Sequence, residues 1–195
     1  MESIRINEYK ALAYRLALVY IFYFLARLAF YSFNHTHLSV EGTSDFLRLA
    51  FYGLLFDTTA IIYVNLLFIF LSVLPLLINA KKSFQKVLFW VYFLCNIPAY
   101  LLNYIDIAYF SYNKTRLTTN DWALVENEHN PITLLSGFLV QYWAVFTLFL
   151  VSVLLWIFLY KKIQVKEKVI TRRKPYFITS VVVLVLLVPS LIFGI

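Results

Sequence analysis

The chain has 195 residues, of which 62% are hydrophobic and 14% are charged, and it carries a net charge of +7. Soluble domains of this size have roughly half apolar and about a quarter charged residues, so the composition excludes an ordinary soluble domain. The basic residues gather in short clusters between long apolar segments, which is typical of membrane topology and not of a nucleic-acid-binding surface. We therefore expect a polytopic integral membrane protein, with the lipid bilayer as its main partner and no nucleic acid.

Five apolar segments reach the length of about 20 residues that a helix needs to cross the hydrocarbon core. In chain order they cover residues 12–33, 49–78, 87–110, 134–160 and 176–195. They are too long for the strands of a membrane barrel, which have about ten residues and alternate in hydrophobicity. The sequence thus predicts an all-α fold in which residues 1–195 form a single transmembrane domain, a bundle of five helices.

The basic clusters predict how this bundle is oriented. Most of the 17 Lys and Arg residues lie at the start of the first segment, between the second and third, and between the fourth and fifth. Because cytoplasmic loops are enriched in Lys and Arg, the N-terminus is predicted to be inside, and five crossings place the C-terminus outside. The clusters are also expected to contact anionic lipid headgroups on the cytoplasmic side.

Short polar signals predict where several helices begin. Ser44 is an expected N-cap, with Asp45 in the first turn, where an acid complements the helix dipole. Asn130 followed by Pro131 is a second start signal, because proline is favoured at the first helical position. As one helix, residues 49–78 would be about 45 Å long, more than a perpendicular crossing requires. Part of this segment, up to Gly53, is therefore expected to lie along the outer interface.

Asp57 lies in the middle of the second apolar segment. A carboxylate within the bilayer costs about 2.5 to 3.5 kcal/mol on insertion scales, unless it faces protein, water or a cation. Arg27, near the outer end of the first segment, is the obvious cation because consecutive helices usually pack side by side. We therefore predict that Arg27 and Asp57 form a pair that holds the first two helices together.

The third segment carries a polar face. Tyr92, Asn96, Ala99, Asn103 and Asp106 recur at steps of three and four residues, so they share one face of a helix, which we expect to point into the bundle. Two members of this face, Asn103 and Asp106, join residues of the first two segments and of the region around the outer end of the third in a predicted polar cluster that opens outward. Its members are Arg27, Asp57, Asn65, Asn103, Asp106, Tyr109 and Arg116.

Two interpretations of this cluster stay open. In one, the polar groups are contacts that fix helix packing and register. In the other, they receive a lipid headgroup or the anionic part of a substrate, with Arg27 or Arg116 binding phosphate.

Other patterns that bear chemistry are incomplete. His35 and His37 precede Glu41 and Asp45, but two histidines without an assured third ligand do not define a metal site. Three further groups are interpreted as a solvated loop face: Glu126, Glu128 and His129. The sequence contains no phosphate-binding loop, nucleophile elbow or zincin motif. No catalytic, cofactor-binding or metal-binding residue is therefore assigned in this chain.

Three features together give the chain a resemblance to a known family. They are Arg27 in the first segment, GLLFD at residues 53–57 and YIDIAYFSYNKTRLT at residues 104–118. With them the chain resembles the N-terminal membrane region of lipoteichoic acid synthase-like proteins, which are members of the sulfatase and alkaline phosphatase superfamily in Bacteroidetes and Firmicutes. The resemblance covers nearly the whole chain and implies a location in the bacterial cytoplasmic (inner) membrane.

In that family the fifth span leads to an extracytoplasmic catalytic domain. This domain uses a threonine nucleophile and a divalent metal, manganese or magnesium, to transfer phosphoglycerol or a related group. The present sequence stops at Ile195, so the resemblance implies that the nucleophile and the metal ligands lie beyond it. No cofactor is expected in these residues.

The resemblance implies a function in anchoring and positioning such a catalytic domain at the outer leaflet and in admitting a lipid-linked substrate there. The loop at residues 110–131, with Trp122 as an interfacial aromatic, would be a docking element. If the chain instead stands alone, the alternatives are a small membrane transporter, a lipid-binding protein or a lipid-modifying enzyme. Whether the chain itself is an enzyme stays open.

Overall fold

The computed structural model describes residues 6–38, 42–74, 79, 81–118, 131–163, 165, 177–178, 180–182 and 185. Every element bounded in these residues is a helix, and no strand occurs among them. The helices are α1 (Ile6–Asn34), η1 (His35–His37), α2 (Thr43–Val64), α3 (Leu66–Val73), α4 (Lys82–Asn113), α6 (Pro131–Gln141) and α7 (Trp143–Lys162). The predicted all-α fold is thus confirmed for the described part of the chain.

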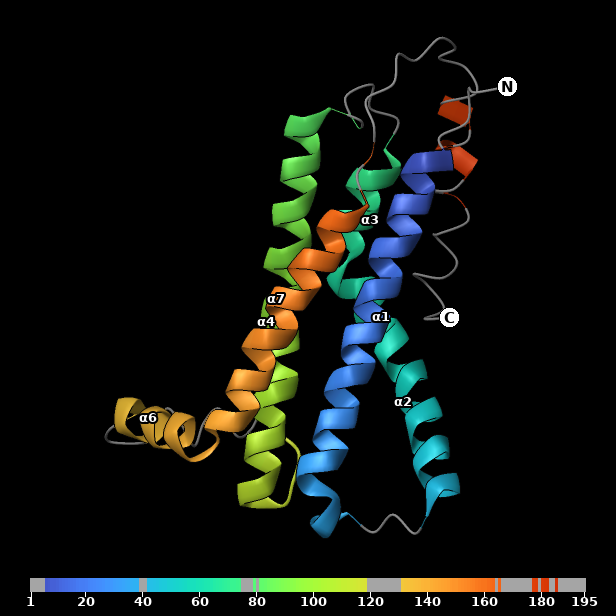
Figure 1. Cartoon of the computed structure of the whole chain (residues 1–195). Coiled ribbons are helices and arrows are strands. Elements are labelled where there is room, and N and C mark those ends of the chain that lie inside the picture. The colour runs from blue at the N-terminus through green and yellow to red at the C-terminus, as the bar shows by residue number, and fades with distance from the viewer. Residues whose placement is uncertain are drawn as a thin grey trace.

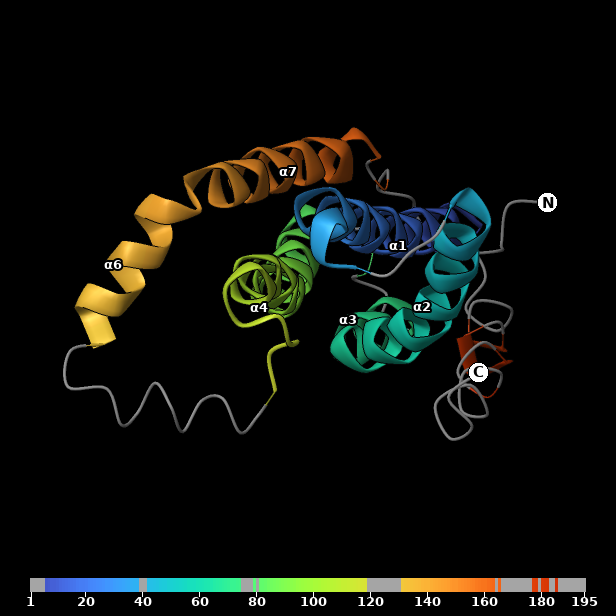
Figure 2. The ribbon, with the colours of Figure 1, turned by 90° about the horizontal axis from the view of Figure 1, so that it is seen from below.

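Helix α1 is the centre of the bundle. It contacts α2, α3, α4 and α7, and α4 in turn contacts α7 and α3. Figure 1 shows α7 crossing α4 with α1 alongside them, while α2 diverges from α1 toward the end where α1 terminates. Seen from below, α6 extends away from the bundle beyond the start of α7 (Figure 2). The buried centre therefore lies between α1, α4 and α7.

Four described helices are long and apolar enough to cross a membrane. They cover Asn7–His37, Ser44–Val64, Lys82–Asn113 and Trp143–Lys162. These correspond to the first four predicted segments. The fifth predicted segment, residues 176–195, lies mostly outside the described residues. The count of five crossings and the orientation of the bundle stay predictions.

Two of the predicted segments are divided in the structure. Residues 49–78 were expected to form one helix, but α2 ends at Val64 and α3 begins at Leu66, with Asn65 between them. The Asn65 amide donates to the Ile61 carbonyl at 3.0 Å, and such side-chain bonds compete with the helix ladder. The discontinuity thus falls at Asn65, whereas Gly53 lies within the continuous helix α2.

The fourth segment, 134–160, divides at Tyr142 into α6 and α7. Tyr142 has φ −109° and ψ 31°, outside helical values. The described crossing candidate in this region is therefore α7 alone.

The observed helix starts agree only in part with the capping signals. Helix α2 begins at Thr43 after Gly42, which has φ +95°, and no side chain caps it. The prediction of Ser44 as the N-cap is therefore wrong, because the chain turns two residues earlier, at Gly42, which accepts this positive φ at little cost. Asp45 does lie in the first turn. Helix α6 begins at Pro131, as expected for proline at the first helical position.

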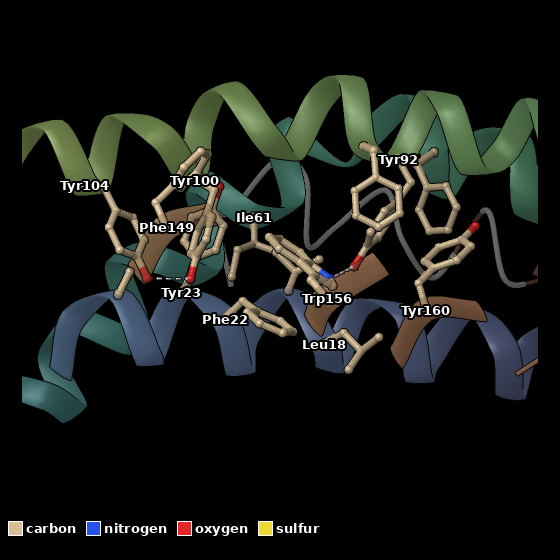
Figure 3. Close-up of a cluster of buried hydrophobic side chains, with 14 of the residues drawn as sticks. Leu18, Phe22, Tyr23, Ile61, Tyr92, Tyr100, Tyr104, Phe149, Trp156 and Tyr160 are labelled. Atoms are coloured by element: carbon tan, nitrogen blue, oxygen red, sulfur yellow. Dashed lines mark hydrogen bonds between the residues drawn. The ribbon is translucent and has the colours of Figure 1, made fainter. Parts of the chain in front are cut away.

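Aromatic side chains fill the space between α1, α4 and α7 (Figure 3). Trp156 of α7 is fully buried and stacks on Phe22 of α1 with ring centroids 4.7 Å apart. Tyr100 of α4 meets the same indole edge to face at 5.2 Å. Such offset and edge-to-face pairs are the favoured aromatic geometries, so ring packing joins the three helices.

Candidate functional site

Arg27 of α1 and Asp57 of α2 form the ion pair that the sequence predicts. Nη2 of Arg27 donates to Oδ2 of Asp57 at 2.6 Å. The two side chains are only 23% and 18% exposed, so the pair is partly shielded by protein. Each charge neutralises the other, which lowers the cost that hydrocarbon would impose on either group alone.

Gly53 makes room for this pair. It lies one helical turn before Asp57 on the same face of α2, and it is buried. A Cβ atom at Gly53 would overlap the guanidinium group of Arg27. The glycine and the aspartate of GLLFD therefore act on one arginine: Gly53 admits the guanidinium and Asp57 binds it.

Asn65 pairs with Asn96 at the discontinuity between α2 and α3. The Asn65 amide donates to Oδ1 of Asn96 at 3.0 Å, and the Asn96 amide donates back to Oδ1 of Asn65 at 2.7 Å. Both side chains are completely buried. Two reciprocal bonds thus satisfy both amides and join the discontinuity to α4.

Asp106 and Arg116 lie at the end of α4, where the chain leaves the helix. Oδ1 of Asp106 accepts from the backbone N–H of Leu117 at 2.8 Å, and Nη1 of Arg116 lies 3.7 Å from Oδ2. The Arg116 guanidinium also lies over the Phe30 ring, 4.4 Å from its centroid. Because the Arg116 side chain is 61% exposed, the ion pair itself is weak. The main effect of Asp106 is to hold residues 116–117 against the helix.

Asn103 and Tyr109 make local contacts. The Asn103 amide donates to the Ala99 carbonyl at 3.0 Å, and the Tyr109 hydroxyl accepts from the Asn113 amide at 2.6 Å. The structure thus brings Arg27 together with Asp57, and Asp106 together with Arg116. Asn65 instead pairs with Asn96, which is not a member of the predicted polar cluster.

A hydroxyl network in the core was not anticipated from the sequence. Tyr100 and Tyr104 share a hydrogen bond at 3.0 Å, and both hydroxyls lie within hydrogen-bond distance of Ser152 Oγ. About one turn further along α7, the Trp156 indole donates to the Tyr92 hydroxyl at 2.9 Å (Figure 3). The sequence does contain a signal for this network, because residues 92, 96, 100 and 104 are polar or aromatic and recur at constant steps of four along one helix face.

Asn34 is a second polar residue whose role was not anticipated. It is fully buried at the end of α1. Its amide donates to the carbonyls of Phe30 and Ile107, each at 3.2 Å, and its Oδ1 accepts from Ser111 at 2.7 Å. Asn34 therefore fastens the end of α1 to α4.

The histidine pattern gives no metal site in the described part of the chain. His35 Nδ1 lies 3.0 Å from the Ser32 carbonyl. No group of three His, Cys, Asp or Glu side chains that could hold an ion occurs among the described residues. Several residues named in the sequence analysis lie outside them: Glu41, Trp122, Glu126, Glu128, His129 and Asn130.

The fold and these contacts define a class: an all-helical bundle with four described helices suited to crossing a membrane. Comparisons of the chain with models of known protein families, with curated proteins and with solved structures find no significant match.

Proposed function

We propose that the chain is the membrane anchor of a lipoteichoic acid synthase-like protein, a phosphoglycerol transferase or sulfatase-family enzyme of the bacterial cytoplasmic membrane. It holds the catalytic domain at the outer leaflet and admits a lipid-linked substrate there. The catalytic threonine and the manganese or magnesium site belong to that other domain.

The arrangement of Arg27, Gly53 and Asp57 carries this proposal. These residues are central to the resemblance. In the structure they are in mutual contact: Gly53 leaves space for the Arg27 guanidinium, and Asp57 neutralises its charge. A sequence likeness based on scattered residues is more informative when those residues depend on one another physically. The unit supports an anchoring role because it joins two helices that are suited to crossing a membrane.

The end of α4 supports the positioning part of the proposal. Asp106 and Arg116 hold the chain where it leaves α4, and Lys114 closes the helix in a left-handed conformation with φ 61°. A fixed exit of this kind gives an attached domain or a headgroup a defined surface beside the membrane.

A transporter is the alternative. A solute path through the centre would have to open the bonds between Asn65 and Asn96 and among Tyr100, Tyr104 and Ser152, all buried. These groups already satisfy one another, so the anchor is the simpler function for this interior.

The decisive experiment is to determine the mass of the native protein isolated from its own membranes. The anchor proposal expects a polypeptide far larger than 23.0 kDa, with a protease-accessible domain outside the membrane and metal-dependent release of phosphoglycerol. A native product of 23.0 kDa would contradict the proposal. Flux of a labelled solute into proteoliposomes that contain only this chain would instead support the transporter.

A further inference from the structure

A groove lies at one end of the bundle, between α1, α4 and α7. Its volume is about 770 Å³, within the range of small-molecule sites. Arg15, Lys82, Lys86 and Lys161 line it, and no acidic side chain is among its described lining residues. We call it the basic groove. Its described lining therefore concentrates positive charge.

Arg15 is the buried member of this group. The residue is only 5% exposed, its Nη2 donates to Gln85 Oε1 at 3.0 Å, and its guanidinium lies 4.3 Å from the centroid of the Tyr160 ring. Its Nε has no hydrogen-bond partner, and no ion pair among the described residues includes it. A buried guanidinium without a carboxylate is costly, so an anion entering the groove would find an uncompensated charge at its wall.

Aromatic and apolar side chains continue the groove along α4. Phe89 and Trp90 line it beside the lysines, and Lys161 Nζ lies 5.6 Å from the Phe89 ring centroid. Trp90 is 62% exposed, and Leu94, one helical turn further on the same face, is 67% exposed. A charged recess therefore continues into an apolar track on the outside of the helix, which suits a molecule with an anionic head and a hydrocarbon chain better than a soluble anion.

We propose that the basic groove binds an anionic phospholipid. Arg15 and the three lysines hold the phosphate of the headgroup, and Trp90 and Leu94 lie along the first part of an acyl chain. Basic recesses between membrane helices are suited to such headgroups. This site lies at the opposite end of α1 and α4 from Asp106 and Arg116, and it does not depend on the function proposed above.

The test uses Trp90 as the reporter. The whole chain is reconstituted in nanodiscs of phosphatidylcholine and titrated with phosphatidylglycerol that carries brominated acyl chains, which quench nearby tryptophans. Phosphatidylcholine with the same brominated chains is titrated in parallel, and the Trp90→Phe variant gives the signal of the other tryptophans. We expect Trp90 to be quenched at a lower mole fraction of phosphatidylglycerol than of phosphatidylcholine. Equal quenching by the two lipids would overturn the proposal.

Three variants distinguish binding in the basic groove from nonspecific attraction of phosphatidylglycerol to surface lysines. Lys86→Gln and Lys161→Gln are each expected to weaken the phosphatidylglycerol response about fivefold, the effect of one lysine near an anionic surface. Lys162→Gln is the matched control, because Lys162 is exposed at the same end of α7 but does not line the groove, and it should leave the response unchanged. An equal loss in Lys162→Gln, or no loss in either groove variant, would refute the site.

Inorganic phosphate distinguishes a lipid from a soluble ligand. Added in millimolar amounts, it should leave the quenching by brominated phosphatidylglycerol in place, because it has no chain to occupy the track beside Trp90. Complete displacement by inorganic phosphate would overturn the assignment to a lipid.

Discussion

The core between α1, α4 and α7 and the arm formed by α2 are attached to the molecule in different ways. In the core, the rings of Tyr92, Tyr100 and Trp156 are fully buried. The Trp156 indole donates to the Tyr92 hydroxyl and the Tyr100 hydroxyl donates to Ser152, each between α4 and α7. On α2, Phe56 is 79% and Leu47 is 62% exposed, and the described polar link to α1 is the pair of Arg27 and Asp57. The core thus depends on ring packing among three helices, whereas the described polar link of α2 to α1 depends on one charge pair.

The largest effect is expected from Trp156→Ala, which removes the indole at the centre of the core. Truncating a buried tryptophan usually costs about 3 to 5 kcal/mol, and here it also leaves the Tyr92 hydroxyl without its donor. The free energy of unfolding can be measured by titration with SDS and followed by circular dichroism. Trp143→Ala is the control, because Trp143 is 66% exposed. Similar losses in the two variants would contradict the assignment of the core.

Asp57→Ala is expected to cost less, about 1 to 3 kcal/mol, because it leaves the partly buried charge of Arg27 without a partner. Adding Arg27→Met should recover part of this loss, since both charges are then gone. A double-mutant cycle on the same unfolding titration measures the coupling. A coupling near zero would show that the pair does not hold α2 to α1.

Gly53→Ala tests, with a smaller change, whether the Arg27 guanidinium occupies the space beside Gly53. The added methyl group must displace the Arg27 guanidinium, and overpacking of this kind costs about 1 to 3 kcal/mol, here at the lower end because an arginine side chain can shift. Gly137→Ala is the matched control, since a Cβ there meets nothing within 4 Å. A Gly53→Ala variant as stable as Gly137→Ala would place the arginine elsewhere.

The smallest effect is expected from the asparagine pair. Hydrogen bonds between membrane helices average about 0.6 kcal/mol and rarely exceed 1.7 kcal/mol. A double-mutant cycle of Asn65→Ala and Asn96→Ala should give a coupling in that range. A coupling above that of Arg27 and Asp57 would reverse the ranking of the two polar links.

The polar link of α2 could be predicted because charge in an apolar segment is expensive. A carboxylate within a long apolar run needs a partner, and Arg27 in the neighbouring segment was the obvious one. The same reasoning could not place Asn65, because a neutral amide is tolerated in many environments and its partner was taken to lie toward the outer end. Only the structure shows that Asn65 divides the segment and pairs with Asn96.

The core was harder to predict for a related reason. Tyrosines in a membrane chain occur both in interfacial belts and in buried sites, and composition does not separate the two. Spacing does: Tyr92, Tyr100 and Tyr104 lie on one face of α4 with Asn96. The division of residues 134–160 at Tyr142 is marked in the sequence only by Gln141, and one polar residue in a long apolar segment does not by itself predict a break.

The burial of Asn34 has a consequence for covalent modification. Asn34, His35 and Thr36 match the N-x-[ST] acceptor signal for N-glycosylation. A transferase must reach the amide nitrogen, yet that nitrogen donates to two backbone carbonyls and the residue has no exposed surface. The folded chain therefore cannot accept a glycan at Asn34. The second acceptor signal, at Asn113, lies on an exposed residue at the end of α4. A glycan-transfer assay would therefore distinguish the two acceptor signals, although both lie at the same end of this pair of helices.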